Sequence, residues 1–245
     1  MEINLIWLDE VGSTSTYLSQ QLDDSMPSGT VVAARSQTAG RGQRGNTWES
    51  EPGKNLSFSL LLRPTDIEAR CQFRISQAVA LGIAGTLSEL LPDHDIRIKW
   101  PNDIYVGNRK ICGILIENSL SGKKISHSIA GIGINVNQTR FVSDAPNPVS
   151  MVQLTGRETE LEPLLLKVVE NIAHELETDP AELHQRYMDR LWNKERMRYR
   201  DTASGREFEA AITGIGPLGH MELTEPDGSR HTYAFKEVAV VLPQL

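Results

Sequence analysis

The sequence predicts an α+β fold, in which one large domain of strands and helices is followed by a small β-barrel or SH3-like domain. Two segments, 69–91 and 160–177, have apolar residues at helical spacing and lie among short apolar runs typical of strands. After residue 195 the helical spacing disappears, and short strand-like runs alternate with glycine-containing turns. The 245 residues and 39% hydrophobic content are sufficient for two domains, which we place at 1–194 and 195–245.

Apolar and β-branched runs bounded by turn residues predict the strands, and helical spacing predicts the helices. In the large domain the predicted elements are a strand at 3–8, a helix at 17–22, strands at 30–36 and 56–63, a helix at 69–91, strands at 96–100, 104–106, 111–118 and 125–136, and helices at 160–177 and 180–192. In the small domain the predicted strands are 197–200, 207–215, 220–224 and 231–241. Hydroxyl side chains at 13–16 and Asp179 suit helix starts, and Pro92 ends the long helix.

The net charge of −7 disfavours general nucleic-acid binding, but parts of the chain are locally basic. Segments 35–54 and 97–110 each carry four basic residues, against two acidic residues in the first and one in the second. Two positive segments in an acidic protein indicate a small anionic ligand. A third basic stretch, 186–200, is interpreted as a solvated linker face, with a contact to nucleotide or to a carrier domain as the alternatives.

The cysteines and histidines do not suggest a disulfide-stabilised or zinc-binding protein. Cys71 and Cys112 give neither a disulfide framework nor a metal-ligand spacing, so we expect both to be reduced. The six histidines form no close pair, and a zinc site is therefore not expected. The first eight residues lack a signal-peptide pattern and no segment approaches transmembrane length, so we expect a cytoplasmic protein with no membrane partner.

The segment 36–48 combines closely spaced glycines with two arginines. Glycine lets the backbone turn and bring its N–H groups against a ligand, while Arg41 and Arg44 supply fixed positive charge, as in an anion-binding loop. The glycine spacing also matches a dinucleotide-binding fingerprint, which requires a helix to begin inside the loop. Residues 46–55 include a proline and a glycine and read as loop, which disfavours that interpretation. A flexible surface hairpin remains the alternative.

A second group of charged residues lies where predicted strands begin or end. Lys99 and Lys110 lie in or beside apolar strands, where an ammonium group is costly unless an anion accompanies it. Asp103 is suited to hold Mg²⁺ together with substrate phosphates, or to cap the turn that follows Pro101. Cations, glycine amides and this carboxylate together indicate phosphoryl or nucleotidyl transfer, although no Walker pattern is present.

Four motifs in chain order resemble those of the biotin protein ligases: the segments 40–48 (GRGQRGNTW), 99–103 (KWPND), 110–117 (KICGILIE) and 133–135 (GIN). The resemblance implies a class II synthetase-like catalytic domain with a central mixed sheet and flanking helices, followed by the SH3-like domain. It also implies activation of biotin by ATP and Mg²⁺ to biotinyl-5′-adenylate, and transfer of biotin to a lysine of a biotin carboxyl carrier protein domain.

The resemblance also implies roles for individual residues. It implies biotin binding by Ser13, Thr14, Gln37, Gly40, Arg41, Lys110, Gly113 and Ile114. It implies ATP binding by Arg41, Arg44, Trp48, Lys99, Asn102 and Asn135. The residues expected to be catalytic are Arg41, Lys99 and Lys110, and the expected metal ligand is Asp103.

The loop departs from many members of that family, because Gln43 and Asn46 stand where they carry arginine, which lowers the loop charge available to retain the adenylate. The chain begins at its first catalytic strand, so we expect no helix-turn-helix repressor domain and no specific DNA binding. The alternatives are a lipoate or octanoate ligase or transferase, a non-catalytic biotin-binding module and a DNA-binding repressor. A homodimer formed by exposed strands is left open.

Overall fold

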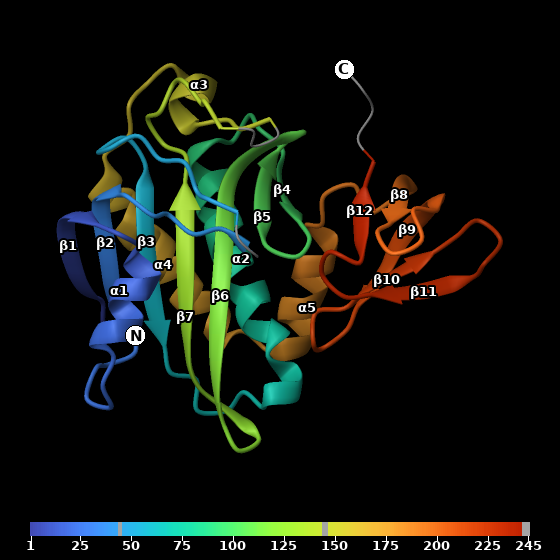
Figure 1. Cartoon of the computed structure of the whole chain (residues 1–245), viewed down its shortest axis with the longest axis horizontal. Coiled ribbons are helices and arrows are strands. Elements are labelled where there is room, and N and C mark those ends of the chain that lie inside the picture. Colours follow the sequence, from blue (N-terminus) through green and yellow to red (C-terminus); the bar gives the residue numbers. More distant parts are fainter. Residues whose placement is uncertain (44–45, 144–146, 242–245) are drawn as a thin grey trace.

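The computed structural model of the chain describes residues 1–43, 46–143 and 147–241. Within these residues the larger sheet has the strand order β1-β2-β3-β7-β6-β5-β4 (Figure 1). Its strands are β1 (Asn4–Val11), β2 (Thr30–Gln37), β3 (Leu56–Leu62), β4 (Ile96–Lys99), β5 (Asp103–Val106), β6 (Arg109–Ser121) and β7 (Lys124–Ile134). β1 and β2 are parallel and the other neighbours are antiparallel, so the sheet is mixed, as expected.

Helices cover both faces of this sheet. They are α1 (Thr14–Gln21), the 3₁₀ turn η2 (Ala69–Cys71), α2 (Phe73–Leu90), α3 (Met151–Thr155), α4 (Leu161–Glu177) and α5 (Pro180–Asp189). In Figure 1 α1 lies in front of the sheet, and α2 and α4 lie behind it. Side chains alternate between the two faces along a strand, and accordingly Val31 packs into the main core while Val32 packs with Leu18 of α1. Residues on both faces of β2 are therefore buried.

The segment predicted to be the small domain folds into a five-stranded antiparallel sheet with the order β11-β10-β9-β8-β12, and we keep this name for it. Its strands are β8 (Met197–Asp201), β9 (Glu207–Ile215), β10 (Met221–Thr224), β11 (Arg230–Tyr233) and β12 (Val238–Val240). The prediction of one strand over 231–241 is wrong, because a turn at 234–237 separates β11 from β12. Lys236 in this turn has φ of 70°, a left-handed conformation that does not continue a strand.

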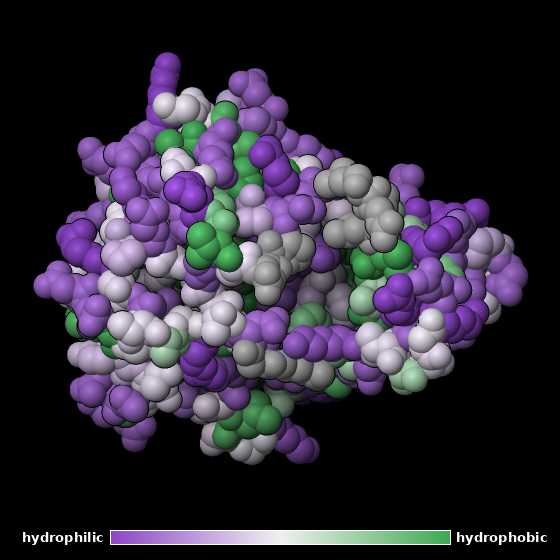
Figure 2. Space-filling model, turned by 45° about the horizontal axis from the view of Figure 1, so that its top comes forward, coloured by the Kyte–Doolittle hydropathy of each residue, from purple (hydrophilic) through white to green (hydrophobic). Residues whose placement is uncertain are grey.

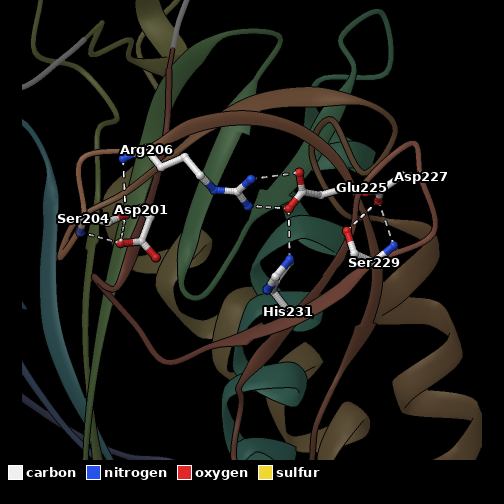
Figure 3. A network of polar contacts seen from close by, with 7 residues as sticks. All are labelled: Asp201, Ser204, Arg206, Glu225, Asp227, Ser229 and His231. Carbon is white, nitrogen blue, oxygen red and sulfur yellow. Dashed lines mark hydrogen bonds and ion pairs between the residues drawn. The ribbon is translucent and has the colours of Figure 1, made fainter.

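Polar contacts tie together the turns of the small domain (Figure 3). Arg206 and His231 both contact Glu225, with His231 Nε2 2.9 Å from the carboxylate. Asp201 accepts hydrogen bonds from the backbone N–H and from the hydroxyl of Ser204, and these contacts hold the pKa of Asp201 below its usual value. The strands of the small domain are thus joined by side chains as well as by backbone hydrogen bonds.

Other boundaries differ from the sequence prediction for local reasons. The long helix expected from residue 69 begins as the 3₁₀ turn, and α2 itself begins at Phe73. The short helix α3 was not predicted, although Ser150 and Gln153 form a complete capping box at its start. Asp179 caps α5 as expected, accepting hydrogen bonds from the backbone of the first turn.

The two sheets meet through a few close contacts. Trp100, which follows β4, donates its Nε1–H to the carbonyl of Gly219 at 2.9 Å, and its ring meets the Phe235 ring edge-on. Gly219 has φ of 90°, and a Cβ atom there would lie 2.5 Å from the Phe73 ring. The small domain therefore docks beside the end of β4. None of the described helices is long and apolar enough to cross a membrane.

Candidate active site

A cavity of about 780 Å³ opens between the large sheet and the small domain. Figure 2 shows the molecular surface hollowed between these two parts. The predicted site residues that line the cavity are Ser13, Thr14, Gln37, Arg41, Trp48, Lys99, Asn102, Asp103, Lys110, Gly113, Ile114 and Asn135. Gly40 lies in the loop beside it, and Arg44 falls outside the described residues. The topology thus brings residues from distant parts of the sequence to one place.

One side of the cavity is formed by hydroxyl and amide groups at the start of α1. The backbone N–H of Thr14 donates to Gln37 Oε1 at 2.8 Å, and the Thr14 hydroxyl is 2.8 Å from that of Ser59. Ser15 contacts the same Ser59 hydroxyl at 2.9 Å. Ser13 occupies the N-cap position, but its side chain makes no capping hydrogen bond and instead lines the cavity. This cluster can donate to and accept from a polar, uncharged ligand group.

The loop at 36–48, with its glycines and Arg41, closes on itself next to these hydroxyls. The backbone N–H of Trp48 donates to the Gly40 carbonyl at 3.0 Å. A Cβ atom at Gly40 would lie 2.7 Å from the Trp48 carbonyl oxygen, so this close approach requires glycine. Arg41 forms an ion pair with Glu117 of β6, with Nη2 2.7 Å from Oε1. Its guanidinium is therefore fixed at the edge of the cavity.

The Trp48 indole lies against the strand backbone where β6 and β7 carry glycines. A Cβ atom at Gly113 would lie 2.9 Å from the indole, and one at Gly133 would collide with it. The Lys110 ammonium lies 5.7 Å from the Trp48 ring centre, within range of a cation–π contact. Glycine at these two strand positions thus makes room for a flat ring on the sheet.

The two predicted lysines lie in different surroundings. Lys110 Nζ is 2.8 Å from Asp103 Oδ1, an ion pair between the starts of β6 and β5. Lys99 instead donates to the Tyr105 hydroxyl at 3.1 Å and faces the rings of Tyr105 and Trp192. Burial lowers the pKa of Lys99, although the nearby Asp103 acts in the opposite direction. Burial also raises the pKa of Tyr105 to about 12, so its phenol stays protonated at neutral pH.

Three buried polar atoms of cavity residues have no hydrogen-bond partner within the described part of the chain: Gln43 Oε1, Trp48 Nε1 and Asn135 Oδ1. The Asn135 amide is oriented by donation from Nδ2 to the Val149 carbonyl at 3.1 Å. Buried polar groups in native proteins are nearly always paired, so these atoms mark places where a bound ligand would donate or accept. Asn102 differs, because its Nδ2 already donates to the Ile114 carbonyl.

The donor set of the cavity fits one magnesium ion bound together with phosphates. The described residues contain no group of three or more histidine, cysteine, aspartate or glutamate side chains that could hold a metal by themselves. Mg²⁺ is often held by one or two carboxylates together with substrate phosphates and waters. Asp103 uses Oδ1 for Lys110, and its Oδ2 can serve as such a ligand.

Several residues that line or support the cavity were not predicted from the sequence. Ser15 and Tyr105 line it. Ser59 and Glu117 do not line it but contact the predicted residues Thr14 and Arg41. The turn residues Phe235 and Lys236 of the small domain also line the cavity. Glu117 ends the motif at 110–117, so the sequence could have suggested it as an ion-pair partner for Arg41. The sequence near residue 235 carries no comparable signal.

The fold and the site define a ligase-type domain, and comparison with known proteins agrees. The family model for the biotin/lipoate A/B protein ligase family matches residues 7–135. The chain belongs to this family, which confirms the resemblance drawn from the sequence.

Among its relatives is the bifunctional ligase/repressor BirA of Bacillus spizizenii, 36% identical over 135 residues, 55% of this chain and 41% of that protein. Another is the biotin--[acetyl-CoA-carboxylase] ligase of Paracoccus denitrificans, 35% identical over 139 residues, 55% of this chain and 57% of the relative. The chain thus spans about half the length of these curated relatives or less. The biotin protein ligase from Aquifex aeolicus, solved in complex with biotin and ATP, matches with a TM-score of 0.79 and 27% identity, covering 97% of this chain and 98% of that one.

Proposed function

We propose that this protein is a biotin protein ligase, which activates biotin with ATP and transfers it to a lysine of a biotin carboxyl carrier protein domain. The observation that carries the proposal is that each of the four motifs contributes residues to the lining of one cavity. The structural similarity to a ligase solved with biotin and ATP supports the same assignment.

The charges of the cavity suit the first half-reaction. The carboxylate of biotin and the α-phosphate of ATP are both negative and repel each other, so cations must neutralise them before they can meet. Arg41, Lys99 and Lys110 supply this charge from three different elements. We therefore assign catalytic roles to these three residues.

The chemistry then needs no protein nucleophile. A carboxylate oxygen of biotin forms a bond to the α-phosphorus of ATP, and the bond from that phosphorus to the bridging oxygen breaks. The electron pair of the broken bond leaves with pyrophosphate. Biotinyl-5′-adenylate is a reactive mixed anhydride, and the loop that carries Trp48, which lines the cavity, would exclude water from it. Attack by a carrier lysine then forms an amide and releases AMP.

The binding roles follow the chemistry of each side of the cavity. We propose that Ser13, Thr14 and Gln37 hydrogen-bond the uncharged ureido ring, and that Gly40, Gly113 and Ile114 approach biotin with their backbone. Trp48, Asn102 and Asn135 are proposed to contact ATP, the last through its unpartnered Oδ1. Arg44 is proposed for the same role, although it lies outside the described residues.

We propose that Asp103 holds Mg²⁺ together with the phosphates of ATP. When bound there, the ion would neutralise phosphate charge. This role is supported by the ion pair of Asp103 with Lys110, a cation that would bind the same phosphate region.

The test is biotin-dependent exchange of labelled pyrophosphate into ATP, with Mg²⁺ present and with lipoate and octanoate as parallel substrates. Exchange with biotin alone supports the proposal without knowledge of the carrier. Exchange with lipoate or octanoate instead would assign the protein to the other branch of its family, which the family name itself makes the second candidate. Biotin binding without any exchange would indicate a non-catalytic binding module.

Other features remain predictions with their own tests. We propose a cytoplasmic location and no specific DNA binding, which a gel-shift experiment with genomic fragments would test. We also propose the domain division at 194/195, in which residues 195–245 are the small domain. A homodimer through the outer strand β1 is testable by light scattering in solution.

A further inference from the structure

Glu117 of β6 contacts Arg41 from outside the cavity. Alternate residues of a strand share a face, so Gly113, Leu115 and Glu117 belong to the same face of β6. Gly113 and Leu115 line the cavity, whereas Glu117 lies two residues further along the strand and does not line it. Its carboxylate is therefore placed to act on a residue of the site and not on a ligand.

The contact between Glu117 and Arg41 uses both oxygens of the carboxylate. Arg41 Nη2 donates to Oε1 at 2.7 Å, and Nη1 donates to Oε2 at 3.3 Å. The Thr16 hydroxyl of α1 lies 3.5 Å from the same Nη1. A bidentate pair fixes the plane of a guanidinium as well as its position. Arg41 is thus held between its own loop, β6 and α1.

This pair does not use up the donors of the guanidinium. A guanidinium has five N–H groups, and Glu117 accepts one from each of the two terminal nitrogens of Arg41. The Nε–H and the second N–H groups can be directed at an anion while the pair is intact. Because Arg41 lines the cavity, it can bind an anion there without losing Glu117.

Glu117 has two opposite effects on Arg41, and their sizes differ. Its negative charge weakens the attraction of Arg41 for anions, but the two side chains are 45% and 44% exposed, so solvent screens this effect. Its geometry removes the many rotamers of a free arginine side chain before the substrates arrive, and small errors of position at a reacting centre cost large factors in rate. The positional effect is therefore the larger one.

We infer that Glu117 is a positioning residue for the adenylation step, which it serves by orienting Arg41. The inference rests on the proposed function. Glu117 touches neither substrate, and it holds the guanidinium where Arg41 neutralises the biotin carboxylate and the α-phosphate as they approach each other. Without Glu117, Arg41 keeps its charge and still attracts both substrates, but its orientation is lost. The loss belongs to the rate of the reaction more than to the binding of either substrate.

Glu117→Ala and Glu117→Gln test the inference in the pyrophosphate exchange assay. We expect Glu117→Ala to lower kcat about tenfold and to change the KM for biotin and for ATP less than threefold. Glu117→Gln should lie between this variant and the wild type, because a glutamine amide keeps one acceptor oxygen for Arg41 but loses the second. A kcat of Glu117→Ala within twofold of the wild type would overturn the inference.

A double-mutant cycle shows whether Glu117 acts through Arg41. Lysine in the variant Arg41→Lys keeps the charge but has no planar fork for a carboxylate to orient. Adding Glu117→Ala to Arg41→Lys should therefore lower kcat less than twofold further. A tenfold loss from Glu117→Ala in both backgrounds would show that Glu117 acts independently of Arg41, which also overturns the inference.

The matched control is Glu207→Ala, which removes the carboxylate from a similar ion pair. Arg200 Nη2 is 2.6 Å from Glu207 Oε1, the side chains are 55% and 37% exposed, and neither residue lines the cavity. This variant should keep the kcat and both KM values of the wild type. An equal loss of kcat in Glu207→Ala would assign the effect to general electrostatics and reject a positioning role. Absence of exchange in the wild type would instead reject the proposed function.

Discussion

Lys99 and Lys110 differ in what balances their charge, and the difference has a consequence for stability. Lys110 has a carboxylate partner at 2.8 Å, whereas the half-buried Lys99 has a phenol and two aromatic rings. Because burial lowers the pKa of Lys99 below the ordinary 10.5, the unfolded chain binds more protons than the folded one between these two values. The free energy of unfolding therefore rises with pH in that window, and the charged form of Lys99 reduces stability below it.

We accordingly expect Lys99→Met to stabilise the protein at pH 7 by about 1 kcal/mol and to abolish pyrophosphate exchange. Urea unfolding at several pH values up to 10.5 measures the first effect, and the variant should lose the rise in stability that the wild type shows there. A variant less stable than the wild type at pH 7 would contradict this account of Lys99.

We expect a substitution of Lys110 to lower the rate of pyrophosphate exchange much more than the affinity for biotin. Lys110→Ala removes one of the cations proposed to neutralise the reacting groups and leaves Asp103 without its ion-pair partner. We expect the exchange rate to fall at least about a thousandfold, the loss of roughly 4 kcal/mol of transition-state stabilisation. Biotin binding, measured by calorimetry, should weaken far less. Equal losses in rate and in biotin affinity would indicate a binding role only.

At the scale of the element, the contact between α2 and α4 depends on a single glycine. A Cβ atom at Gly82 would lie 2.7 Å from the backbone nitrogen of Ile172, whereas one at Gly85 in the same helix has nothing within 4 Å. Gly82→Ala should therefore destabilise the protein by about 1–3 kcal/mol through overpacking. Gly85→Ala should be neutral or stabilising by up to about 1 kcal/mol, since alanine is the better helix former.

Denaturant unfolding of both variants provides the measurement, and the second variant is the control for the first. A similar change in stability at the two positions would show that helix propensity, and not the packing of the two helices, dominates. No residue of α2 or α4 lines the cavity, so the exchange kinetics of folded Gly82→Ala should be close to those of the wild type.

How far the sequence predicts an element depends on where its contacts come from. The strand–loop–strand around Arg41 and the start of α5 are specified by residues next to each other, and both were predicted. The break in the last predicted strand was not predicted, because residues 234–237 include none of the usual turn residues and part of the turn's support comes from Thr202, which follows β8. The residues that line the cavity differ in the same way. Those in the four motifs were predicted from their spacing. Phe235 comes from the small domain, and the sequence around it carries no motif.

At the scale of the whole molecule, the docking of the two domains is tested by a matched pair of glycines. Gly219 and Gly228 have φ of 90° and 89°, so alanine is strained at both positions. Only at Gly219 does a Cβ atom meet the large domain, 2.5 Å from the Phe73 ring. Gly219→Ala should therefore lose about 1–3 kcal/mol more of unfolding free energy than Gly228→Ala.

The Gly219→Ala and Gly228→Ala variants also test whether the position of the small domain affects the cavity, because Phe235 and Lys236 line it from that domain. A shifted small domain should raise the KM for ATP in Gly219→Ala but not in Gly228→Ala. Equal ATP kinetics in the two variants, despite a difference in their stability, would show that domain docking and nucleotide binding are independent.

The position of β3 in the large sheet bears on how the chain folds while it is being made. β3 is paired on one side with β2, which precedes it closely, and on the other with β7, which follows only after α2 and three further strands. As the chain leaves the ribosome, the edge of β3 that pairs with β7 stays incompletely paired until residue 134 has emerged. Until then its apolar side chains and unpaired edge are open to other chains, so slow completion of the sheet favours aggregation.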